Sequence, residues 1–182
     1  MKRRFIIFNE MLLWVEGSVA ALLSLIILVA IFWQVLCRYV FMISTPWSEE
    51  LARYLFICLS YIGAGVGVYH AQFVSIDLVD KILDWKSKKA EEYKLMVEKA
   101  SLVLTLIFLV YFGRLYWAYL QNIARLGQRS AAMRINMLFP MSSIMIGTIC
   151  MTIHGFCRLI TSKEERLAVK TELKVQKEEK AI

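Results

Sequence analysis

The sequence predicts an all-α integral membrane protein with four transmembrane helices and additional interfacial amphipathic helix segments. Hydrophobic residues make up 59% of its 182 residues, more than is usual in a soluble domain, and it has only two prolines. Stretches 17–37, 54–76 and 135–157 contain no Asp, Glu, Lys or Arg, and 100–124 contains only Arg114. About 20 apolar residues in a helix span a hydrocarbon layer of about 30 Å, so each stretch can cross a bilayer.

The distribution of basic residues predicts that both termini are cytoplasmic. Lys and Arg are retained in cytoplasmic flanks, and with the N-terminus inside, fifteen lie on the cytoplasmic side and five on the outer side. The outer five are Arg38, Arg53, Arg125, Arg129 and Arg134. This bias, together with attraction to anionic phospholipids, accounts for the net charge of +7 without any nucleic-acid partner.

Two domains are expected. The basic start followed by an apolar stretch resembles a signal peptide, but the stretch is too long and no small-residue cleavage site follows, so it should persist as the first helix. Residues 1–162 then form the four-helix transmembrane domain. Residues 163–182 carry mixed charge and little apolar content, and we expect a cytoplasmic tail that is a frayed helix or disordered.

The connection between the second and third apolar stretches predicts an amphipathic helix at the inner membrane interface. Within 76–85, apolar and charged residues alternate at helical spacing. The apolar set is Ile76, Val79, Ile82 and Leu83, and the charged set is Asp77, Asp80, Lys81 and Asp84. From Ala90 the helical pattern continues into the third stretch, which predicts one helix longer than the bilayer is thick.

Ionisable residues fall toward the predicted ends of the spans, which argues against an ion pathway through this chain. They are Glu16, Glu98, Lys99 and Arg158 near the inner ends and Arg38 and Arg114 near the outer ends. All are expected to reach the headgroups. A slightly shifted first helix would place Glu16 deeper. A small multidrug exporter that uses Glu16 as its coupling carboxylate therefore remains an alternative.

No catalytic residue, metal site or cofactor is predicted. His70 and His154 fall toward the same side of the membrane, where two imidazoles could bracket a haem. With only two histidines, coincidence also explains their placement, and a haem- or quinone-associated membrane anchor of an oxidoreductase remains a second alternative. The cysteines form no CxxC pair and are expected to be small apolar fillers. They are Cys37, Cys58, Cys150 and Cys157.

Small residues predict a close-packing face on the second helix. Gly63 and Gly67 are one turn apart, with Ser60 and Ala64 on an adjacent line. A phosphate-binding loop would need a strand before the glycines, whereas here they lie inside an apolar helix. Small residues at this spacing allow two helices to approach closely in lipid.

The segment TPWSEELARY, residues 45–54, predicts a capped helix start. Thr45 suits the N-cap and Pro46 the first helical position. Glu49 and Glu50 then lie near the positive end of the helix dipole, and Arg53 is spaced to pair with either carboxylate. These residues form either a simple helix start with an internal ion pair or a polar docking surface, with Trp47 beside it in the interfacial belt.

The region VLCRYVFMISTPWSEELARYLFICLSYIGAGVGVYHAQFVSIDLV resembles the small membrane subunit, the Q subunit or DctQ component, of tripartite ATP-independent periplasmic (TRAP) transporters. The matching positions are Arg38, Tyr39, Trp47, Ser48, Glu49, Glu50, Gly63, Val74, Ser75, Ile76 and Asp77. Phe73 stands where the family often has histidine, so the role of that histidine does not carry over.

The resemblance implies a non-catalytic scaffold in the bacterial inner membrane. Its partners would be a large sodium-coupled, elevator-type membrane subunit and a periplasmic protein that delivers an acidic solute, such as a sialic acid, a dicarboxylate or a keto acid. Nothing in this chain identifies the substrate. The candidate subunit-interface residues are Arg38, Trp47, Ser48, Glu49, Glu50, Arg53, Gly63, Gly67 and Asp77.

Overall fold

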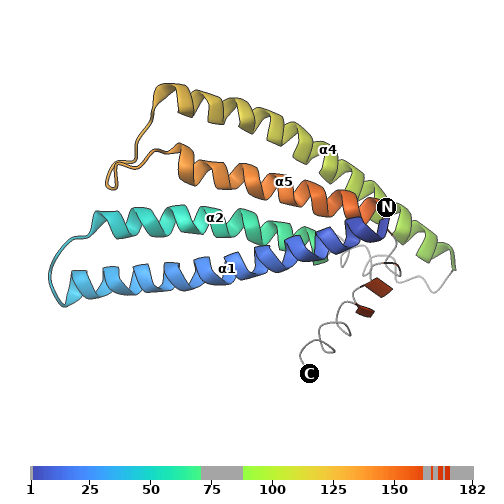
Figure 1. Ribbon diagram of the computed structural model, residues 1–182, viewed down its shortest axis with the longest axis horizontal. Helices are drawn as coiled ribbons and strands as arrows, with labels where there is room; N and C mark the ends of the chain where they lie inside the picture. The colour runs from blue at the N-terminus through green and yellow to red at the C-terminus, as the bar shows by residue number, and fades with distance from the viewer. Residues whose placement is uncertain (1, 71–87, 162–164, 166–167, 170, 173–182) are drawn as a thin grey trace.

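Four long helices form the part of the chain that the computed structural model describes, residues 2–70, 88–161, 165, 168–169 and 171–172 (Figure 1). They are α1 (Lys2–Tyr39), α2 (Pro46–His70), α4 (Lys88–Leu126) and α5 (Leu138–Ile160). Each contains a segment long and apolar enough to cross a membrane. The prediction of an all-α protein with four transmembrane helices is confirmed. The predicted amphipathic helix at 76–85, including Asp77, lies outside the described residues.

The helix boundaries extend beyond the uncharged stretches of sequence. Helix α1 begins at Lys2 and has 38 residues, and α4 has 39, so each is more than 50 Å long at about 1.5 Å per residue. The expected continuous helix from Ala90 into the third span is confirmed, because α4 already begins at Lys88. Helix α2 begins at Pro46, as predicted. The fixed φ of proline and its missing N–H suit the first position of a helix.

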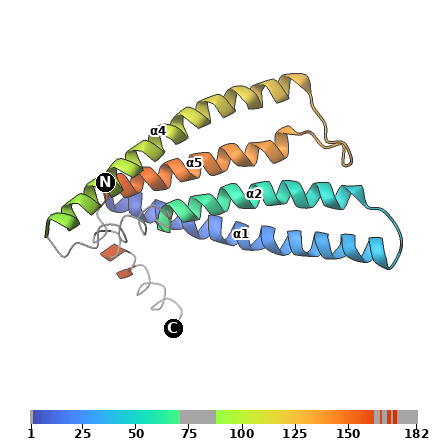
Figure 2. The ribbon, with the colours of Figure 1, turned by 180° about the vertical axis from the view of Figure 1, so that it is seen from behind.

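The helices lie side by side in the order α1, α2, α5, α4 (Figures 1 and 2). Helix α2 packs against α1 and α5, α4 packs against α5, and α1 makes a smaller contact with α5. We call the end with the α1–α2 and α4–α5 connections the loop end, and the end with the start of α1 and the end of α5 the terminal end. The ribbons lie close together at the terminal end and spread toward the loop end.

The interior of this array is small, and it depends on close helix contacts. Val68, Leu109 and Met151 form its apolar cluster, with Tyr61 packed against it. A Cβ atom on Gly147 would lie 2.7 Å from the Cβ of Tyr61, so glycine is what lets α5 approach α2 at this point. Many large apolar side chains on all four helices remain exposed. These surfaces suit contact with lipid or with another membrane protein.

Candidate functional site

The carboxylate of Glu50, early in α2, holds the loop between α4 and α5. Its backbone donors are the N–H groups of Ala131, Ala132 and Met133, at 3.2, 2.9 and 2.8 Å. Its side-chain donors are the hydroxyls of Ser130 and Tyr54, at 3.1 and 2.7 Å. We call Glu50 with residues 130–133 the loop-end clamp. It ties the start of α2 to the connection between two helices that follow much later in the sequence.

The loop held by this clamp has a defined backbone. Helix α4 ends at Leu126, and the next residue, Gly127, has a φ of +59°, which favours glycine. The N–H of Ser130 donates to the carbonyl of Ile135 over 2.9 Å, which folds the loop back on itself. Arg134 takes a φ of +55°, a conformation that non-glycine residues seldom adopt. The bonds from Glu50 therefore fix a tight turn.

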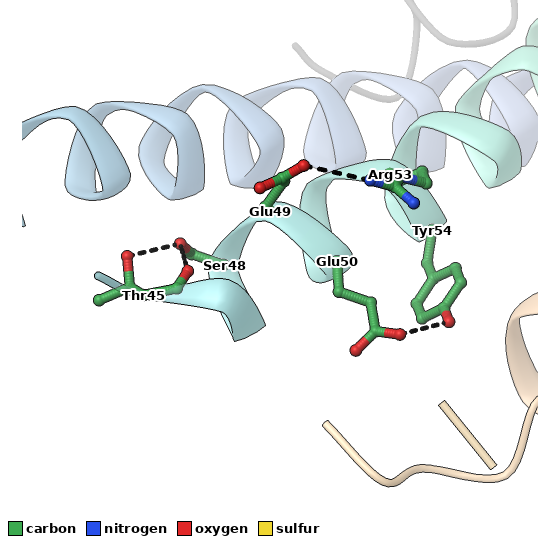
Figure 3. A network of polar contacts seen from close by, with 6 residues as sticks. All are labelled: Thr45, Ser48, Glu49, Glu50, Arg53 and Tyr54. Atoms are coloured by element: carbon green, nitrogen blue, oxygen red, sulfur yellow. Dashed lines mark hydrogen bonds and ion pairs between the residues drawn. The ribbon is translucent and has the colours of Figure 1, made fainter. Parts of the chain in front are cut away.

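The adjacent carboxylate of Glu49 points elsewhere (Figure 3). It pairs with Arg53 one turn further along α2, over 3.2 Å, and both side chains are exposed. An exposed pair of this kind contributes only about 0.3–0.5 kcal/mol. Glu49, Arg53 and Trp47 are therefore exposed at the loop end, whereas Glu50 is occupied within the chain.

Thr45 directly precedes α2, as predicted, and its hydroxyl contacts a side chain. The hydroxyl of Thr45 contacts the hydroxyl of Ser48 over 3.0 Å, and that of Ser48 donates to the Thr45 carbonyl over 2.8 Å (Figure 3). Ser48 is fully buried and stabilises the turn into α2, so its side chain is not available to a partner. Arg38 lies nearby, where it and Glu49 line a hollow of about 420 Å³ at the loop end.

A second polar group lies inside the array toward the terminal end, and we call it the terminal-end cluster. His154 of α5 contacts two residues of α1: its Nδ1 lies 2.7 Å from Asn9 Oδ1, and its Nε2 lies 2.9 Å from Glu16 Oε2. All three residues are at most 4% exposed. A Cβ atom on Gly65 of α2 would lie 3.1 Å from both oxygens of Glu16. Three helices therefore meet around one carboxylate.

The chemistry of the cluster follows from its donors and acceptors. An imidazolium can donate to both oxygens, and a neutral ring can donate to Glu16 while the Asn9 amide turns to donate to Nδ1. At the edge of the cluster, Tyr69 of α2 packs its ring against His154 at 5.6 Å between centroids, and its hydroxyl donates to Glu10. The arrangement links α1, α2 and α5 by polar contacts inside a mainly apolar array.

The expectation that the ionisable residues of the spans reach the headgroups is wrong for Glu16 and Arg158, which are buried inside the array. Helix α1 begins at Lys2, so Glu16 lies about four turns from the start of the helix. There it is buried against α5. Arg158 is also buried, and its guanidinium donates to the carbonyl of Val68, over 3.4 Å, near the end of α2. Basic side chains stabilise the carbonyls at a helix C-terminus, where no further turn follows.

The contacts of His154 argue against the haem alternative. Both ring nitrogens of His154 already bond to Asn9 and Glu16, and neither can become an iron ligand without breaking the cluster. His70 is exposed at the end of α2, with its ring against Tyr69. Among the described residues, no group of three or more His, Cys, Asp or Glu is placed to hold a metal ion.

The small residues predicted to pack closely lie on an outer face of α2. Ser60, Gly63 and Ala64 are exposed, and a Cβ atom on Gly63 or Gly67 would meet nothing within 4 Å. The glycines that make close contacts inside the chain are instead Gly65 and Gly147. The face of α2 formed by Ser60, Gly63, Ala64 and Gly67, here called the small-residue face, therefore has no partner among the described residues.

Comparison with protein families identifies the family of the chain. The family model described as "Tripartite ATP-independent periplasmic transporters, DctQ component" matches residues 27–164. The chain belongs to the DctQ family. A comparison with curated proteins found no match. The predicted family is thus confirmed, and with it a role as the small membrane component of a TRAP transporter.

Several features of this DctQ chain were not predicted from sequence. Asn9 and Glu16 are seven residues apart and share one face of α1, and this spacing is the signal that could have paired them with the single intramembrane histidine of α5. The bonds from Glu50 to residues 131–133 had no such signal, because they depend on a turn more than 80 residues away.

Proposed function

We propose that this DctQ chain is a non-catalytic scaffold that holds the large, sodium-coupled transport subunit of a TRAP transporter in a fixed position in the bacterial inner membrane. The large subunit would move an acidic solute, such as a sialic acid, a dicarboxylate or a keto acid, by an elevator-type symport. A periplasmic binding protein would deliver that solute. The termini would lie in the cytoplasm and the loop end in the periplasm, as the basic residues favour.

The small-residue face of α2 is the main support for this proposal. Gly63 and Gly67 have open space above them, although α2 lies between α1 and α5 in the array. Glycines on an outer helix face allow another backbone to approach closely, and in lipid such approach is a major source of helix association. A helix of the large subunit packed here would contact two neighbouring helices of the scaffold as well.

Polar side chains at the loop end would extend the same interface. Trp47, Glu49 and Arg53 are exposed within the first two turns of α2, next to Arg38. The loop-end clamp supports them, because Glu50 holds the neighbouring loop in one conformation. The same loop carries exposed Arg129 and Arg134, which would face either lipid headgroups or an acidic surface of the binding protein.

Co-purification with the large subunit tests the scaffold role. The DctQ chain is co-expressed with a large TRAP subunit from the same organism, and the complex is captured through a tag on the DctQ chain. We expect Gly63→Leu to reduce the amount of captured large subunit, because a bulky side chain would hold the partner helix away. The matched control is Gly17→Leu on α1, which also introduces leucine at a helical glycine with open space above it.

Three outcomes would contradict parts of this proposal. Equal capture by the Gly63→Leu and Gly17→Leu variants would reject the small-residue face as the interface. Failure of the unaltered chain to capture the large subunit would reject the scaffold role altogether. Solute transport by this chain alone in liposomes, abolished by Glu16→Gln, would favour the exporter alternative instead.

A further inference from the structure

Arg114 is the one charge in the apolar stretch 100–124, and its position in α4 leaves it far from either end of the helix. It precedes the last residue of α4, Leu126, by 12 residues, about 18 Å. The adjacent Gly113 packs against Thr148 of α5, with 3.6 Å between the glycine's Cβ position and Thr148 Cγ2. The sequence favoured a position near the outer headgroups, whereas the distance of Arg114 from the end of α4 indicates a deeper one.

The depth of Arg114 in the bilayer is inferred from its position beside α5. Helix α5 runs from Leu138 to Ile160, so Thr148 lies close to its middle. If α5 crosses the bilayer, Arg114 lies near the midplane, about 15 Å from either headgroup layer. Side chains on a helix tilt toward its N-terminus, which turns Arg114 away from the loop end. The guanidinium is therefore poorly placed to reach the outer headgroups.

Arg114 has no charged or hydrogen-bonding partner among the described residues. It is exposed and lines a groove of about 400 Å³ between α4 and α5. Val110, Trp117, Ile149 and Ile153 form much of the groove wall. The hydroxyl of Thr148, which also lines the groove, donates to the carbonyl of Ile144 in its own helix. The groove is thus apolar around a single unpaired cation.

An unpaired charge at this depth needs an anion at the same depth. A phospholipid phosphate lies in the headgroup layer, far from Arg114. A hydrated ion is disfavoured, because the groove walls on both sides of Arg114 are apolar. A carboxylate on a neighbouring transmembrane helix lies at the right depth and forms a two-pronged hydrogen-bonded pair with guanidinium.

We propose that the groove between α4 and α5 receives a transmembrane helix of the large subunit that presents an Asp or Glu carboxylate to Arg114 near the bilayer midplane. This proposal rests on the proposed scaffold function. It adds a second contact, on different helices from the small-residue face of α2, and it names the chemistry of the partner residue. Carboxylates are rare inside membranes, so this contact would also select the correct partner.

Site-specific photo-crosslinking in the co-expressed complex tests the proposal. A benzoyl-phenylalanine probe replaces Val110 or Ile149 in the groove, and Phe108 on another exposed face of α4 serves as the control position. We expect adducts with the large subunit from the two groove positions and none from position 108. Arg114→Met should lower the captured large subunit by about tenfold or more, and Arg114→Lys by less.

The chain itself should fold normally without this guanidinium, because Arg114 makes no polar contact with described residues. The Arg114→Met variant should therefore match the unaltered chain in membrane insertion and thermal unfolding, and the rim variant Arg125→Met should retain the complex. Adducts of phospholipid mass alone at the groove positions would overturn the proposal in favour of a lipid site. A captured complex without groove adducts would overturn it while leaving the scaffold function intact.

Discussion

The loop end and the terminal end of the helix array are both held by a glutamate, but in opposite surroundings. Glu50 at the loop end is half-buried and accepts three backbone N–H groups from a turn. Glu16 at the terminal end is 4% exposed and bonds to the side chain of His154. One carboxylate fixes a loop at the surface, and the other links helices inside the array.

Burial, more than the number of hydrogen bonds, determines how much each glutamate contributes to the stability of the fold. If Glu50 is removed, water can reach the freed N–H groups, because Ala131 and Ala132 are exposed. If Glu16 is removed, His154 is left at 1% exposure with no water to replace its partner. The terminal-end cluster makes fewer bonds, yet its disruption should cost more stability.

The largest effect is expected from Glu16→Ala. Removing one partner of a buried pair destabilises a protein by about 3–5 kcal/mol, because the other polar group stays buried and unsatisfied. Thermal unfolding of the purified protein in detergent measures the loss. The double variant Glu16→Leu with His154→Leu should recover much of it, because neither polar group then remains. An unchanged unfolding temperature for Glu16→Ala would mean that the cluster contributes little to stability.

A smaller effect is expected when the space beside Glu16 is filled from α2. Gly65→Val would force a side chain against both carboxylate oxygens, and overpacking of this kind costs about 1–3 kcal/mol. Gly63→Val is the matched control two residues away, with the same change in helix propensity and open space above it. The unfolding temperature should fall for Gly65→Val alone. Equal losses in the two variants would show that helix propensity, and not contact with Glu16, is responsible.

At the loop end, Glu50→Ala should act locally. We expect a smaller loss of stability than in the Glu16 and Gly65 variants, because the freed donors can bond to water. The clearest readout is hydrogen exchange: the amides of Ala131, Ala132 and Met133 should lose protection, while those within α5 keep it. Retained protection of these three amides would contradict the assignment of Glu50 as the residue that fixes the turn.

The sequence predicted the helices well, because each span is an uncharged stretch long enough to cross a bilayer. It also predicted Pro46 as the first residue of α2. It did not predict the burial of Glu16, since a charge near the end of an apolar stretch is equally compatible with a headgroup contact. That choice depends on where α1 begins and on how α5 packs against it.

The candidate interface was also predictable only in part, because the sequence does not show which helix faces turn inward. Periodicity placed Gly63 and Gly67 on one face of a helix, but it did not show whether that face turns inward or outward. Trp47, Ser48, Glu49 and Glu50 are consecutive in the sequence. Ser48 and Glu50 nevertheless form hydrogen bonds within the chain. A motif read along the sequence does not separate residues that hold the scaffold together from those that remain exposed.

The smallest effect on stability is expected from Glu49→Ala, the neighbour of the Glu50 variant. Glu49 pairs only with exposed Arg53 on its own helix, so its loss should change the free energy of unfolding by at most about 0.5 kcal/mol. The informative measurement is co-purification with the large subunit. If Glu49 docks the partner, Glu49→Ala should reduce capture although the isolated chain stays fully stable. Undiminished capture would limit the role of Glu49 to the helix start, and the loop end would then contribute to the complex mainly through Trp47 and Arg53.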